Sequence, residues 1–112
     1  DFPARRDDYA ALATYLEEQG EMPRIVLGDF NATPFCADYQ AFARRLALRN
    51  ARDMHGIARH YTLGTWPAWL PAFLRLSIDH ALHTPELRAT FHAIPGETGS
   101  DHLPLLTTFA WK

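Results

Sequence analysis

The sequence predicts a mixed α/β fold of the α+β kind, in the order helix, strand, helix and then three strands. Three observations predict it. The chain has 112 residues and is 47% hydrophobic, which is typical of one modest globular domain. Two segments in its first half repeat apolar residues at helical spacing. The second half contains runs in which apolar and polar residues alternate, as they do in strands.

The first half of the chain predicts two amphipathic helices and a buried strand between them. Residues 4–19 form the first helix, which ends at Gly20, and residues 24–28 form a short β-branched strand after Pro23. Residues 37–48 form the second helix. The apolar faces of the two helices consist of Tyr9, Leu12, Ala13 and Leu16, and of Tyr39, Phe42, Ala43 and Leu46.

The single cysteine and the arginines give no strong functional signal. Cys36 cannot form an internal disulfide and has no metal-ligand spacing around it, so we expect a small packing residue. The net charge of −2 disfavours a broad nucleic-acid-binding surface. A local basic stretch remains, which we expect to be a solvated helix face and loop. Its members are Arg44, Arg45, Arg49, Arg52 and Arg59.

The second half of the chain predicts strands. Residues 75–83, 87–94 and 103–111 form the three strands of the predicted order, and residues 61–66 fit an additional short strand that Gly64 interrupts. In the strand 75–83, alternation divides the side chains between two faces. Leu76, Ile78, His80 and Leu82 share one face, and Ser77, Asp79 and Ala81 share the other.

Residues 66–73 form an apolar segment that contains two prolines. Pro67 and Pro71 exclude a central strand and a helix interior. We therefore expect a loop whose aromatic side chains pack in the domain core, with contact to a base or a lipid surface as the alternative.

Three short polar motifs stand in a fixed order along the chain. They are Gly28-Asp29-Phe30-Asn31, Ser77-Ile78-Asp79-His80 and Gly99-Ser100-Asp101-His102. Each motif places a carboxylate at or near the end of an apolar run, with a second polar group within two residues. This pattern is typical of a small acidic site for a metal ion and a phosphate.

Asp29 and Asn31 are the first candidate pair. If the backbone stays extended, both side chains project to the same side of the strand. The carboxylate can then orient or deprotonate a water, and the amide can donate to a phosphate oxygen. The alternative is an Asx turn that closes the strand and needs no chemistry.

The other two motifs predict a carboxylate–histidine pair. Asp79 lies among apolar neighbours, where a carboxylate needs a partner, and His102 is the partner that we favour. His80 points to the opposite strand face, so we expect a core histidine with satisfied hydrogen bonds. Asp101 offers a metal ligand beside the imidazole of His102. Taken alone, the Ser-Asp-His motif also fits a turn or a helix cap.

Together the motifs resemble those of the endonuclease/exonuclease/phosphatase superfamily, which has the deoxyribonuclease-I-like fold. Thr65-Trp66 matches a recurring Thr/Ser-aromatic element of that family, which makes Trp66 a candidate substrate contact. Residues 64–80 resemble a bacterial branch, some members of which carry membrane segments ahead of the catalytic domain. The resemblance covers nearly the whole chain and implies a Mg²⁺- or Mn²⁺-dependent hydrolase of phosphate esters.

The resemblance also implies a role for each matching residue. Asp29 would orient or activate the attacking water, and Asn31 would hold the scissile phosphate. Asp101 would be a metal-site carboxylate, directly or through a water, and Asp29 and Asn31 would be further metal ligands. His102 would contact the phosphate and stabilise the developing charge, with Asp79 hydrogen-bonded behind it.

The resemblance further implies that residues 1–112 are a single partial domain. The family fold is a four-layer α/β/β/α sandwich, and this chain matches its C-terminal half, one mostly antiparallel sheet with helices on one face. The N-terminal half normally carries an Asn, the principal metal-binding Glu and a further His or Tyr, which no position here matches. The opening at Asp1-Phe2-Pro3, directly ahead of a helix, also fits a boundary inside a longer protein. We therefore expect little activity from this chain alone, and self-association through a bare apolar sheet face.

Two other functions stay open at the level of the sequence. One is a non-catalytic interaction or scaffold domain of the same fold with relic motifs, and the other is a nucleic-acid-binding module that uses the arginines. For the phosphoesterase, the expected partner is a phosphodiester substrate, either nucleic acid or a phospholipid or inositol phosphate. The sequence indicates no compartment, although the resemblance fits a membrane-anchored bacterial parent.

Overall fold

Helices and antiparallel strands make up the described part of the chain, which confirms the predicted mixed α+β fold class. The computed structural model describes residues 2–55, 64–71 and 74–112. Its elements are α1 (Phe2–Glu18), β1 (Ile25–Asp29), α2 (Ala37–Arg45), β2 (Arg49–Asn50), the 3-10 helix η1 (Ala51–His55), β3 (Asp79–His83), β4 (Leu87–Ala93) and β5 (Leu106–Trp111). None of the described helices is long and apolar enough to cross a membrane.

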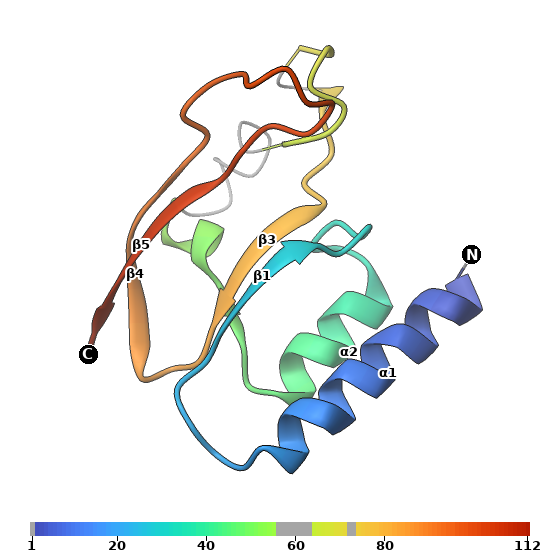
Figure 1. Cartoon of the computed structure of the whole chain (residues 1–112), viewed down its shortest axis with the longest axis vertical. Helices are drawn as coiled ribbons and strands as arrows, with labels where there is room; N and C mark the ends of the chain where they lie inside the picture. Colours follow the sequence, from blue (N-terminus) through green and yellow to red (C-terminus); the bar gives the residue numbers. More distant parts are fainter. Residues whose placement is uncertain (1, 56–63, 72–73) are drawn as a thin grey trace.

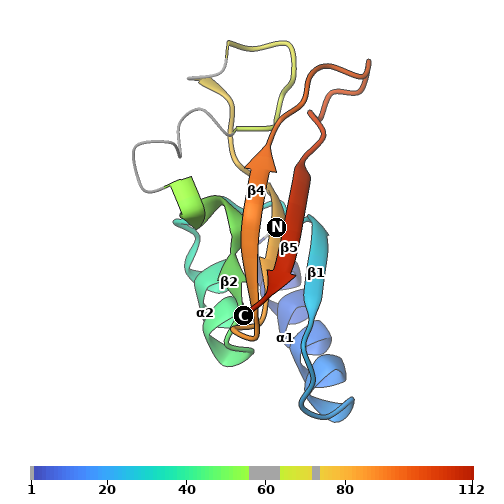
Figure 2. The same cartoon turned by 90° about the vertical axis from the view of Figure 1, so that its left-hand side faces the viewer.

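The strands belong to two antiparallel sheets, where the sequence led us to expect one. The first sheet has the strand order β1-β3-β2, and the second is the hairpin β4-β5. Helices α1 and α2 cover one face of the three-stranded sheet, and the hairpin lies on the other side of it (Figures 1 and 2). The ring of His83 in β3 meets the ring of Phe109 in β5, with centroids 5.4 Å apart.

The expectation of a bare sheet face is therefore wrong over β3. Ala81 and His83 alternate with the core residue Leu82 and so lie on the face away from the helices, yet both are buried, because the hairpin covers this part of the face. The edge strand β1 remains open, with Ile25 and Leu27 exposed. Leu106 of β5 is half exposed as well.

The hydrophobic core lies between the helices and the three-stranded sheet. Its largest fully buried side chain is Leu82, in the central strand β3. The buried members of this core are Tyr9, Ala13, Phe30, Ala32, Tyr39, Phe42, Leu46, Leu48 and Leu82. Cys36 and Ala43 pack against its edge, as expected for small apolar residues. The predicted helix faces are therefore the faces that are buried, except for Leu12, which is 37% exposed.

Helix α2 ends three residues earlier than predicted. Ala47 has a φ of 54°, in the left-handed region, and the N–H of Leu48 donates to the carbonyl of Ala43 at 2.8 Å. This reversal ends the helix and directs the chain into β2, which was not predicted.

Two predicted strands are shorter in the structure. The strand expected over 75–83 begins only at Asp79, and Leu76 forms an isolated bridge with Trp66. The strand expected over 103–111 begins at Leu106, because Pro104 has no N–H for the ladder. Of the strand expected over 61–66, residues 61–63 lie outside the described residues.

Candidate active site

The register of β1 on β3 places two carboxylates opposite each other. Asp29, the last residue of β1, pairs with Asp79, the first residue of β3. Residues directly opposite in an antiparallel pair share one face, with Cβ atoms about 5 Å apart. Like charges in that arrangement repel, so the pair needs a donor or a cation beside it.

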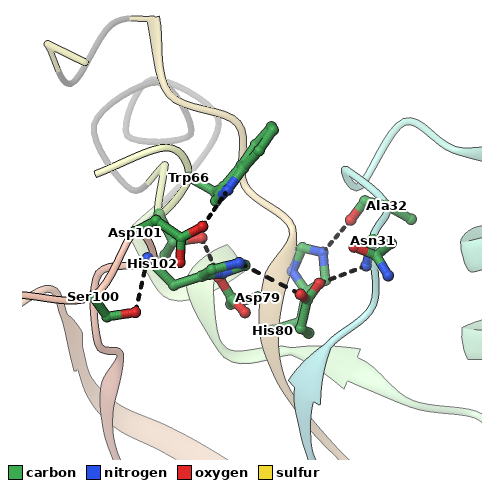
Figure 3. Close-up of polar contacts among 10 residues, drawn as sticks. Asn31, Ala32, Trp66, Asp79, His80, Ser100, Asp101 and His102 are labelled. Carbon is green, nitrogen blue, oxygen red and sulfur yellow. Dashed lines mark hydrogen bonds and ion pairs between the residues drawn. The ribbon is translucent and has the colours of Figure 1, made fainter. Parts of the chain in front are cut away.

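His102 supplies that donor (Figure 3). Its Nδ1 lies 2.8 Å from Asp79 Oδ2, and its Nε2 lies 3.6 Å from Asp29 Oδ2. Because an ionised carboxylate only accepts hydrogen bonds, Nδ1 carries the proton in the contact with Asp79. The predicted contact between Asp79 and His102 is confirmed.

The surroundings of His102 favour its charged form. The hydrogen bond to Asp79 raises the pKa of His102 above its ordinary value. Burial opposes this shift, while the negative charges of Asp79, Asp29 and Asp101 add to it. In its charged form the imidazole can donate from Nε2 as well as from Nδ1.

The Asp29–Asn31 segment is a turn and not an extended strand end. Asn31 has a φ of 50°, which an Asn adopts more readily than most residues, and its N–H donates to Asp29 Oδ1 at 2.8 Å. The extended backbone that would project the Asp29 and Asn31 side chains to the same side is therefore absent, and the alternative, an Asx turn, is present. The turn leaves Asp29 Oδ2 on the side of His102 and both side chains exposed.

Asp101 lies beside Trp66 at the rim of the site. The indole N–H of Trp66 donates to Asp101 Oδ2 at 3.4 Å, and the Trp66 ring lies 6.3 Å from the His102 ring between centroids. Asp101 is exposed, and Trp66 is partly buried. The expectation that the aromatic segment packs in the core is wrong for Trp69, which is 78% exposed.

Backbone hydrogen bonds fix the loop that carries Asp101 and His102. The N–H of Ala68 donates to the carbonyl of Asp101 at 2.7 Å, and the N–H of Leu103 donates to the carbonyl of Thr65 at 2.8 Å. The N–H of His102 donates to Ser100 Oγ at 3.2 Å. The segment 64–68 therefore holds this loop against the start of β3.

His80 is buried in the core with both ring nitrogens bonded, as predicted. Its Nε2 lies 2.7 Å from the carbonyl of Ala32, and its Nδ1 lies 3.1 Å from Asn50 Nδ2. Asn50 Nδ2 also donates to the hydroxyl of Tyr39 at 2.9 Å. Burial lowers the pKa of His80 to about 4 and raises the pKa of Tyr39 to about 12. His80 is therefore a neutral donor to the loop that follows Asn31.

The arginine stretch does not form one solvated face. Arg44 and Arg49 are exposed, and Arg45 binds Glu17 of α1 at 2.7 Å, as a surface residue does. Arg52 is only 3% exposed, so the expectation of a solvated side chain is wrong there. Arg59 lies outside the described residues.

The described residues offer one group of closely spaced donors for a cation. Ligand atoms of Asp29, Asp79 and His102 all lie within 4.8 Å of one another. Asp79 Oδ2 already accepts two hydrogen bonds, from Thr65 and from His102. Asp101 is not a member of this group. Carboxylate oxygens suit a hard divalent ion, but such an ion takes six or more ligands, so this set fits one side of a metal site.

A groove of about 810 Å³ runs along this side of the molecule. Asp8, Asp29, Asn31, Trp66 and His102 contribute polar groups to its lining. The other lining residues are Tyr9, Leu12, Val26, Leu27, Gly28, Phe30, Leu76 and Ile78. The candidate site therefore opens into a groove in which a polar ligand can reach His102.

The family model of the Endonuclease/Exonuclease/phosphatase family matches residues 1–102. The chain belongs to this family. The family takes its name from nucleases and phosphatases, which hydrolyse phosphate esters. A search of curated proteins gave no match.

Solved structures of this family share the fold of the chain. An endonuclease/exonuclease/phosphatase of Bacteroides vulgatus is 26% identical, with a TM-score of 0.76 over 98% of this chain and 45% of its own. A mannosyl-6-phosphatase of Bacteroides thetaiotaomicron is 21% identical, with a TM-score of 0.73 over 99% of this chain and 47% of its own. An endonuclease/exonuclease/phosphatase family protein of Bacteroides thetaiotaomicron is also 21% identical, with a TM-score of 0.72 over 100% of this chain and 46% of its own. The chain thus spans slightly less than half the length of these structures.

Proposed function

We propose that residues 1–112 are the C-terminal half of the catalytic domain of a metal-dependent phosphoesterase. The row of contacting side chains Asp29, His102 and Asp79 carries this proposal, and its members Asp29 and His102 line the groove. It joins two carboxylates and an imidazole whose pKa is raised, which suits the binding and protonation of a phosphate group. Membership of the family and the half-length match to its solved structures support the proposal.

Each residue of the site has a role in this proposal. Asp29 is exposed, lines the groove and orients or deprotonates the attacking water with its carboxylate. His102, held by Asp79, donates from Nε2 to a phosphoryl oxygen and stabilises its charge. The amide of Asn31, exposed beside Asp29, donates to the same phosphate.

A divalent metal belongs to the same proposal. Asp29 would hold Mg²⁺ or Mn²⁺ with Asn31 as a further oxygen donor, and the exposed Asp101, which lies outside the closely spaced group, would act on the ion through a bound water. The ion would supply positive charge to the phosphate in the transition state. The incomplete set of donors is the reason to assign further ligands to the other half of the domain.

The proposed substrate is a phosphodiester, either nucleic acid or a phospholipid or inositol phosphate. Trp66 lines the groove next to His102 and offers an aromatic face to such a substrate. One structural neighbour is named a mannosyl-6-phosphatase, which acts on a phosphomonoester. A test of the proposed function therefore needs both a phosphodiester and a phosphomonoester.

We expect the chain alone to show little or no turnover, because its site lacks ligands for the metal. The measurement is hydrolysis of bis(p-nitrophenyl) phosphate and p-nitrophenyl phosphate with Mg²⁺ or Mn²⁺, by the chain and by the complete protein. The complete protein should turn over at least one of them and lose this activity with EDTA. Comparable turnover by the chain alone would contradict the half-domain assignment. Inactivity of the complete protein on a broad panel of phosphate esters would favour the scaffold function.

We also propose that the isolated chain self-associates through the open edge strand β1. Ile25 and Leu27 are exposed there, beside the half-exposed Leu106 of β5. Light scattering should give a mass above the 12.7 kDa of one chain, increasing with concentration. Leu27→Asp should reduce that mass, whereas Tyr15→Asp, at a 60% exposed position of α1, should not. A monomer at high concentration would refute this interface.

A further inference from the structure

Thr65 connects both members of the Asp79–His102 pair. Its hydroxyl donates to Asp79 Oδ2 at 2.6 Å, the same oxygen that accepts the hydrogen bond from His102 Nδ1 at 2.8 Å. Its carbonyl accepts from the N–H of Leu103, the residue that follows His102. One residue therefore fixes the carboxylate through its side chain and the histidine loop through its backbone.

Thr65 is itself held rigidly. It is completely buried, and its N–H donates to the carbonyl of Leu76 at 2.9 Å. The preceding residue, Gly64, packs so closely on Arg75 that a Cβ at position 64 would lie 2.6 Å from the Cβ and carbonyl oxygen of Arg75. Because Gly64 has no Cβ, the segment of Gly64 and Thr65 can approach the segment of Arg75 and Leu76 to hydrogen-bonding distance. The Thr65 hydroxyl therefore has little freedom to choose another acceptor.

We propose that Thr65 is a positioning residue for the reaction, which keeps Asp79 Oδ2 directed at His102 Nδ1. This inference rests on the proposed function, since it assigns a purpose to the orientation of His102. A side-chain carboxylate with one donor can rotate away from its partner, whereas two donors on the same oxygen fix its orientation. Thr65 is not among the residues that line the groove, and its hydroxyl acts on His102 through Asp79.

The test uses the tautomer of His102 in the isolated chain, without metal and at a fixed pH where the imidazole is neutral. Ring ¹⁵N shifts report which nitrogen carries the proton, and the contact with Asp79 requires it on Nδ1. Thr65→Val removes the hydroxyl at similar volume, so we expect His102 to move toward the Nε2-protonated form. Thr65→Ser keeps the hydroxyl and should retain the original shifts. Asp79→Asn replaces the carboxylate that holds His102 Nδ1–H, so it gives the largest change in the His102 ring shifts against which the Thr65 variants are compared.

The double variant separates positioning from a general loss of structure. In the Asp79→Asn background, Thr65→Val should cause no further change in the His102 shifts, because the group through which Thr65 acts is already altered. The ring shifts of His80, whose bonds to Ala32 and Asn50 lie in the core, serve as the control for an intact fold. If Thr65→Val is unstable, Thr65→Ala provides the same comparison.

Unchanged His102 shifts in folded Thr65→Val or Thr65→Ala, together with changed shifts in Asp79→Asn, would overturn the inference. In the complete protein, Thr65→Val should lower kcat about ten-fold relative to Thr65→Ser with little change in KM. The tautomer measurement needs no turnover. A changed tautomer in a protein without phosphoesterase activity would therefore refute the proposed function and leave the positioning contact in place.

Discussion

Replacing His102 with Ala in the complete protein is expected to lower kcat by about 10²- to 10⁴-fold, the range for loss of a general acid or an oxyanion donor. The imidazole is the one group of the row that can donate into the groove, since Asp29 and Asp79 only accept when ionised. Steady-state hydrolysis of the best substrate from the ester panel gives the measurement.

Two controls belong to this experiment. Ser100→Ala removes the hydroxyl that accepts from the His102 N–H in the same loop, and it should cost less than about ten-fold because a loop hydrogen bond of this kind contributes about 1 kcal/mol. Chemical denaturation should show that His102→Ala remains folded, since the side chain is partly exposed at the groove. A fall in kcat of less than ten-fold for His102→Ala would contradict the role assigned to it.

Acidification is expected to destabilise the fold through His80. Burial lowers the pKa of His80 to about 4, while the unfolded chain has the ordinary value of about 6.5. Between these values the unfolded chain binds the proton and the folded chain does not. The stabilisation is therefore complete above about pH 6.5 and is lost as the pH falls toward 4. The loss reaches about 3 kcal/mol, which is a large part of the stability of a small domain.

Urea unfolding at a series of pH values between 7.5 and 4.5 measures this slope. His80→Gln keeps an amide donor for the carbonyl of Ala32 and cannot protonate, so its stability should depend less on pH over the same range. His102 changes the stability of the fold with pH in the opposite direction. Because the pKa of His102 is raised in the folded chain, His102 stabilises the fold at low pH, and this contribution is lost as the pH rises through that pKa. His102→Ala should therefore retain the loss on acidification or make it larger. An unchanged slope in His80→Gln would refute the assignment to His80.

The parts of the fold and site that follow from local pattern could be predicted. Helical spacing identified the buried faces of both helices, and strand alternation placed Asp79 and His80 on opposite faces. The cost of an unpartnered carboxylate indicated a histidine beside Asp79, and His102 is there. These inferences depend on geometry within a few residues or on the energy of one buried group, which a single sequence contains.

The parts that depend on contacts distant in the sequence could not be predicted. The division of the strands into two sheets follows from where the hairpin β4-β5 docks, which alternation does not encode. The turn at Asn31 required a choice between two local conformations that the motif left open. Thr65 was visible only as part of a matched motif with Trp66, and its bond to Asp79 appears only when residues 14 positions apart meet.

The opposed pair Asp29 and Asp79 has a consequence for how such a site can diverge. Both carboxylates belong to the backbone ladder between β1 and β3, so their spacing is inherited from the sheet. A slip of one residue in either strand would turn its carboxylate toward the helices and its core residues away from them, so the site and the core would be lost together. His102 arrives on the connection between β4 and β5, which tolerates insertion and exchange as surface connections do. A change in this connection can therefore reposition His102 without moving the acidic pair.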